Sequence, residues 1–115
     1  MAIRIREIRL YQHPLRTRFP FRYGIATMTD VPHLMLVASV EVDGKLARGV
    51  SADNLVPKWF TKDPNTTPQQ DVEQMLATVR RACRIAQEMK ASASVFEFWR
   101  ELYERRVAES EEPPL

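Results

Sequence analysis

The stretch HLMLVASVEVDGKLARGVS, His33 to Ser51, decides how the first half of the chain folds. Asp43 and Gly44 separate two runs rich in apolar residues. This dipeptide is the strongest short signal for a β-hairpin, because both residues tolerate a positive φ. The stretch therefore predicts two antiparallel strands, over 33–42 and 45–51, joined by a two-residue turn.

The first of these strands is apolar on both sides. Leu34 and Leu36 point to one face of the sheet, while Met35 and Val37 point to the other. An antiparallel sheet with one face in water alternates apolar and polar residues more cleanly. We therefore expect one face to be covered by helices and the other to need a further partner.

A third strand is predicted at the N-terminus, over 3–11, where isoleucine and leucine alternate with arginine. The alternation slips by one residue at Glu7, which predicts a β-bulge or a twist there. Residues 13–30 contain two prolines and a glycine, so a long irregular loop is predicted there. Residues 52–66 form a second long irregular segment.

Two helices are predicted in the second half, over 68–90 and 95–107. Thr67 with Gln70, and Ser94 with Glu97, match the capping-box pattern. Each helix has one apolar stripe at helical spacing: Val72, Met75, Leu76, Val79, Cys83 and Ala86 in the first, and Val95, Phe98, Trp99 and Leu102 in the second.

The predicted fold class is α+β, a three-stranded antiparallel meander followed by a helical segment. We expect one domain over residues 1–109 and a disordered tail over 110–115.

The composition of the 115 residues, 44% hydrophobic and 28% charged, is typical of a globular domain. No apolar run is long enough for a transmembrane helix, and the N-terminus lacks the apolar core of a secretory signal. Cys83 is the only cysteine, so no internal disulfide can form. These features predict a cytoplasmic protein without a membrane partner.

The N-terminal 22 residues carry six arginines against the single acid Glu7. Such a strip suits an anion, or it forms the solvated side of an edge strand. No aromatic side chains interleave with it as nucleic-acid binding favours, so no nucleic acid is expected. A stand-alone module that binds an anion or a protein through this strip stays open as an alternative function. The arginines are Arg4, Arg6, Arg9, Arg16, Arg18 and Arg22.

No catalytic centre and no metal site are predicted within the chain. His13 and His33 have no metal-ligand spacing to each other or to a carboxylate cluster. Three dispersed glycines cannot form a phosphate-binding loop. Asp53 follows a strand, where it can orient a ligand or, more commonly, form a turn.

Four segments in this order carry a family resemblance: IRIREIRLY, LRTRFPFRYGIATMT, HLMLVASVEVDG and ARGVSADNLVPKWFTKDP. From about Ile3 to Arg106 the chain resembles the N-terminal capping domain of the enolase superfamily, closest to the mandelate racemase/muconate lactonizing enzyme group. The resemblance implies a cap over the mouth of a (β/α)₇β barrel. Two loops, 18–29 and 51–59 here, would close over the substrate. The substrate-binding residues it implies are Arg22, Tyr23, Ile25, Thr27, Met28, Asp53, Asn54, Lys58 and Trp59.

The resemblance also implies that catalysis belongs to a second domain. In a full-length form, a barrel domain would be the partner of this cap and would hold Mg²⁺ with its carboxylates. It would abstract a proton next to the carboxylate of a small substrate, as a racemase, dehydratase or cycloisomerase, hence an isomerase or lyase. Such a barrel needs about 200–250 further residues. We therefore expect these 115 residues to bind no cofactor, to be non-catalytic alone, and to form a homo-oligomer through the uncovered sheet face.

Overall fold

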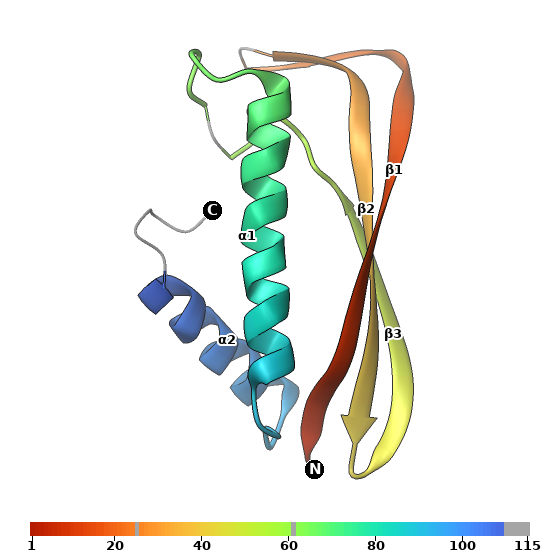
Figure 1. Cartoon of the computed structure of the whole chain (residues 1–115). Helices are drawn as coiled ribbons and strands as arrows, with labels where there is room; N and C mark the ends of the chain where they lie inside the picture. Colours follow the sequence, from red (N-terminus) through yellow and green to blue (C-terminus); the bar gives the residue numbers. More distant parts are fainter. Residues whose placement is uncertain (25, 61, 110–115) are drawn as a thin grey trace.

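The computed structural model describes residues 1–24, 26–60 and 62–109, and the predicted disordered tail over 110–115 lies outside these ranges. A three-stranded antiparallel sheet in the order β1-β2-β3 precedes two helices (Figure 1), which confirms the α+β prediction. The elements are β1 (Ile3–Tyr23), β2 (Ala26–Val42), β3 (Lys45–Asn54), α1 (Pro68–Glu88) and α2 (Val95–Glu109).

The hairpin predicted around Asp43 and Gly44 is confirmed. Asp43 has φ 49° and Gly44 has φ 81°, the left-handed values that a two-residue hairpin turn requires. The bulge predicted at Glu7 is also present, because the pairing of β1 with β2 shifts register between Ile5 and Glu7.

The predicted irregular loop over 13–30 is wrong. β1 and β2 continue as a paired hairpin to Tyr23 and Ala26, with one break in register between Arg16 and Phe21. At that break both strands bend toward the N-terminal end of α1 (Figure 1). Pro14 does not end the strand because β1 is an edge strand, where a proline whose nitrogen points outward removes no ladder bond.

The other element bounds differ less. β3 runs to Asn54, three residues beyond the predicted end at Ser51, so the start of the predicted second loop is strand. α1 ends at Glu88 and α2 at Glu109, each within two residues of the predicted helix ends.

α1 covers one face of the sheet. The core forms where Leu34 of β2 and Leu55 pack with Met75 of α1. The predicted capping box is present: the Thr67 side chain accepts from Gln70 N, and the Gln70 side chain accepts from Thr67 N. The backbone N–H groups of Thr67 and Gln70, which have no acceptor within the helix, are therefore both hydrogen-bonded.

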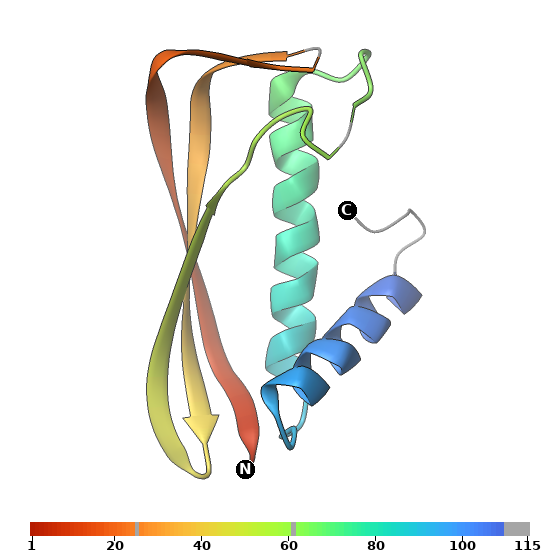
Figure 2. The same cartoon turned by 180° about the vertical axis from the view of Figure 1, so that it is seen from behind.

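The apolar stripe predicted for the second helix is buried only in part. α2 lies diagonally against the C-terminal half of α1 (Figure 2), and Phe98 and Leu102 are half-buried. Val95 and Trp99 are exposed instead, and Trp99 stacks on Tyr103 with 5.6 Å between ring centroids. A single neighbouring helix is too narrow to bury all four positions of the stripe.

The sheet face opposite the helices carries exposed Tyr11, Met35, Leu46 and Val50. Both helices lie on the other side of the sheet (Figures 1 and 2). Within the part of the chain that the structure describes, this face has no covering element.

Candidate functional site

A cleft of about 290 Å³ lies where the tip of the β1–β2 hairpin meets the segment that follows β3. Because the strands bend over the end of α1, two segments far apart in the sequence, the first ending at Met28 and the second beginning at Asp53, form its walls. Its lining residues are Phe21, Tyr23, Met28, Asp53, Asn54, Val56, Trp59 and Phe60.

Aromatic rings dominate the cleft. Phe21 stacks on Tyr23 with 5.9 Å between ring centroids, and Tyr23 meets Trp59 edge-on at 5.8 Å. The Tyr23 hydroxyl donates a hydrogen bond to the Pro57 carbonyl, which ties the hairpin tip to the second segment. Burial, and secondly the negative charge of Asp71, raise the pKa of the Tyr23 phenol, so Tyr23 is a neutral donor here.

The polar side of the cleft is formed by the end of β3. Asp53 Oδ1 accepts a hydrogen bond from Asn54 N at 2.8 Å, and both residues belong to strand β3, so the turn expected at Asp53 is not found. Asn54 Oδ1 lies 2.8 Å from His33 Nδ1 of β2. These bonds fix an acid and an amide beside the aromatic rings.

A buried ion pair holds the second segment against α1. Lys58 Nζ lies 3.1 Å from Asp71 Oδ2, and the contact is an ion pair without hydrogen-bond geometry at that oxygen. The ammonium donates to the carbonyl oxygens of Asp63 and Thr66, and Thr66 Oγ1 donates to Asp71 Oδ1 at 2.6 Å. Lys58 has φ 64°, so this network fixes a left-handed residue directly before Trp59.

The structure brings five of the nine predicted site residues together, namely Tyr23, Met28, Asp53, Asn54 and Trp59. Of the other four predicted residues, three lie outside the cleft and one lies outside the described residues. Arg22 and Thr27 pair across the hairpin and are exposed outside the cleft. Lys58 contacts Asp71 instead of the cleft, and Ile25 lies outside the described residues.

Three lining residues were not predicted from the sequence: Phe21, Val56 and Phe60. Period-two alternation in a strand would have placed Phe21 on the same face as Tyr23. The prolines and the glycine of this segment hide that signal, because they favour a loop. Val56 and Phe60 lie in irregular backbone, where no periodicity points to them.

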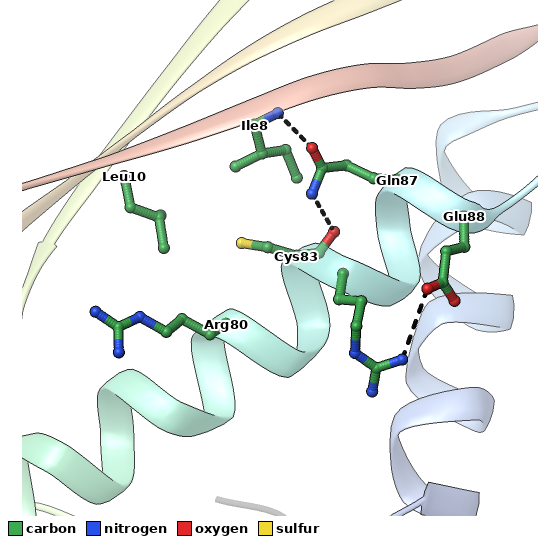
Figure 3. A pocket seen from close by; sticks show the side chains of 7 residues that line it. Ile8, Leu10, Arg80, Cys83, Gln87 and Glu88 are labelled. Carbon is green, nitrogen blue, oxygen red and sulfur yellow. Dashed lines mark hydrogen bonds and ion pairs between the residues drawn. The ribbon is translucent and has the colours of Figure 1, made fainter.

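A larger cavity of about 550 Å³ lies between β1 and α1. Figure 3 shows Gln87 bridging its wall: Gln87 Oε1 accepts from Ile8 N at 3.0 Å, and Gln87 Nε2 donates to the Cys83 carbonyl at 3.1 Å. Cys83 is buried as predicted, and burial raises the pKa of its thiol. Since the thiolate is the reactive form, this cavity offers no nucleophile.

Three of the six arginines of β1 have an acidic partner. Arg9 Nε lies 2.8 Å from Glu7 Oε1, Arg16 Nε lies 3.5 Å from Asp30 Oδ1, and Arg6 approaches Glu41 at 3.9 Å. Exposed pairs of this kind contribute little stability. They lower the local positive charge, however, and so weaken the alternative that this strip binds an anion.

No group of three or more His, Cys, Asp or Glu that could hold a metal ion occurs within the described ranges. Among the helices that the structure describes, none is long and apolar enough to cross a membrane. Comparisons with protein-family models, with curated proteins and with solved structures give no match for this chain.

Proposed function

We propose that this chain is a non-catalytic capping and specificity domain of the mandelate racemase/muconate lactonizing enzyme group. Its cleft would form the lid wall over a small carboxylate substrate held by a catalytic barrel. The full-length protein would abstract a proton next to that carboxylate with Mg²⁺.

One observation carries the proposal. The two segments that the resemblance assigns to substrate closure meet in a single aromatic cleft, one as the tip of the β1–β2 hairpin and the other as the end of β3 with the residues after it. They do so at one end of the molecule, above the N-terminus of α1 (Figure 2). A lid wall requires this convergence, because residues on two separate loops can shape one pocket only if the fold brings them together.

The chemistry of the cleft suits a lid. Trp59 and Phe60 are each more than half exposed, so the rim presents aromatic surface to an incoming domain. When such a surface closes over a reacting centre it expels water, which strengthens the electrostatic interactions inside. Asp53 and Asn54 would then contact hydroxyl or amine groups of the substrate at a distance from the reacting carbon.

The described residues do not fit a Mg²⁺ site, since they hold no group of three or more His, Cys, Asp or Glu side chains that could bind a metal ion. No catalytic step is therefore derived through the metal for this chain. Its role in the proposal is to shape and close the pocket.

The reading frame downstream of the codon for Leu115, in the gene and its transcript, tests the proposal. We expect the frame to continue, or a neighbouring gene to follow, with a barrel sequence that carries acidic strand ends and a Lys-x-Lys motif. A stop codon after Leu115 and no such barrel sequence beside it would contradict the proposal.

A further inference from the structure

The two edges of the sheet are protected differently. On β1, Ile3 exchanges two backbone hydrogen bonds of 2.8 Å with Ser92, and Ile8 N donates to Gln87. On β3, every residue from Lys45 to Asn54 is exposed. In the described part of the chain, the outer edge of β3 makes one backbone hydrogen bond, in which Asn54 N donates to its neighbour Asp53 Oδ1.

The hairpin turn determines which β3 residues direct their backbone groups outward. A two-residue turn makes Val42 and Lys45 a hydrogen-bonded pair, and bonded pairs then alternate along the strand. Two bonds agree with this pattern, because Asn54 N points outward to Asp53 Oδ1 and Leu55 N points inward to the Pro32 carbonyl. The outward donors and acceptors are those of Leu46, Arg48, Val50 and Ala52.

We propose that two copies of this chain pair antiparallel through their β3 edges, about a two-fold axis at Gly49, so that their sheets become continuous. In this register Arg48 forms a hydrogen-bonded pair with Val50 of the second copy, and Leu46 with Ala52 of the second copy. An open edge of this length is a template for such pairing. Two-fold pairing is the commonest closed arrangement.

Charge selects the register. With the axis at Gly49, Lys45 lies directly opposite Asp53 of the second copy at both ends of the paired strands. Opposite charges in this position stabilise a strand pair, and like charges destabilise it. An axis at Arg48 places two arginines opposite each other, and an axis at Val50 moves Lys45 away from Asp53.

Glycine at the axis also suits this register. Directly opposed residues in a non-hydrogen-bonded pair approach most closely, with Cα atoms about 4.5 Å apart. Gly49 has no side chain to oppose its own copy, and a Cβ added there meets no atom within 4 Å inside one chain.

The pairing adds a residue of the second copy to the cleft. Asp53 lines the cleft wall, so Lys45 of the second copy would bring a positive charge to its rim. The pairing itself rests on the open edge and does not depend on the proposed capping function.

Sedimentation velocity across a concentration series tests the pairing. We expect reversible dimer formation for the unmodified chain. Val50→Pro removes an outward N–H, which an edge strand tolerates, and should leave a folded monomer. Val50→Thr keeps the N–H and should still dimerise. Far-UV circular dichroism of both variants shows whether they fold.

Disulfide trapping tests the register. In a Cys83→Ala background, Gly49→Cys should form a covalent dimer on mild oxidation, because the expected separation lies within the range of disulfides, about 4.4–6.8 Å between Cα atoms. Ser51→Cys is the matched control. In the proposed register the two introduced cysteines would be offset by four residues, roughly 14 Å along the strand. This variant should therefore run as a monomer in gel electrophoresis without reducing agent.

Several outcomes would overturn the proposal. One is a monomer at high micromolar concentration for the unmodified chain, and another is a Val50→Pro variant that dimerises as before. Equal trapping of Gly49→Cys and Ser51→Cys would refute the register. Lys45→Asp and Asp53→Lys should each weaken the dimer when made alone. Made together they exchange the two charges and should restore it, and failure of this rescue counts against the pairing.

Discussion

Replacing Asp71 by asparagine would leave the buried ammonium of Lys58 without its counter-ion. The side chains are 2% and 9% exposed, and the charges lie 3.1 Å apart. Removing one partner of a buried pair typically costs about 3–5 kcal/mol, because the remaining buried charge has lost its counter-ion. Domains are stable by only about 5–15 kcal/mol, so Asp71→Asn should lose a large share of the folding free energy.

Urea unfolding followed by far-UV circular dichroism measures this loss. Lys58→Met should also destabilise the fold, while the double variant should lose less than the sum of the two single losses, since no charge is then left buried. Glu109→Gln is the matched control: it breaks an ion pair with Arg84 that is shorter, at 2.6 Å, but about half exposed. That change should cost less than about 1 kcal/mol.

Burial, and not distance, decides the size of these effects. If Asp71→Asn and Glu109→Gln cost the same small amount, the buried network does not hold the 58–71 segment, and this reasoning is refuted.

Three further outcomes are expected. The raised pKa of Tyr23 means that the folded state holds the phenol proton more tightly than the unfolded state does. The free energy of unfolding should therefore be constant below the ordinary tyrosine pKa and should fall as pH rises through the pKa of Tyr23 in the folded state. Tyr23→Phe should reduce this alkaline loss in unfolding experiments across pH, whereas an identical loss would contradict the burial of Tyr23. Thr67→Ala removes the capping box and should lower the free energy of unfolding, measured in urea, by about 1 kcal/mol. An unchanged free energy of unfolding would contradict the role of this cap. Buried Cys83 should react with a thiol reagent only after denaturant is added, and rapid labelling of the folded chain would contradict its burial.

Local chemistry made much of the fold predictable. The Asp43-Gly44 turn, the Glu7 bulge and the Thr67 cap each depend on a few adjacent residues, and each is present. Pro14 misled the prediction because its effect depends on where its nitrogen points in the sheet. That direction is set by pairing with residues far along the chain, which sequence spacing does not reveal.

The candidate site could be predicted in part for the same reason. The resemblance indicated Tyr23 and Trp59, and the structure places their rings in a T-shaped contact. The role of Lys58 was missed because its partner Asp71 belongs to the first turn of α1, and no local pattern links the two. The left-handed backbone of Lys58 was equally hidden, since it is held by that distant contact.

The central claim, that the hairpin tip and the segment after β3 form one substrate-facing wall, is tested most directly in a chimaera. Residues 1–109 would replace the cap of a mandelate racemase-group enzyme, and kcat/KM would be measured over a panel of small carboxylates. We predict that Trp59→Ala and Tyr23→Ala each change the order of substrate preference, while Trp99→Ala, on the exposed face of α2, leaves it unchanged. An inactive chimaera with an intact barrel Mg²⁺ site, or substrate preferences that are the same in all three variants, would contradict the account.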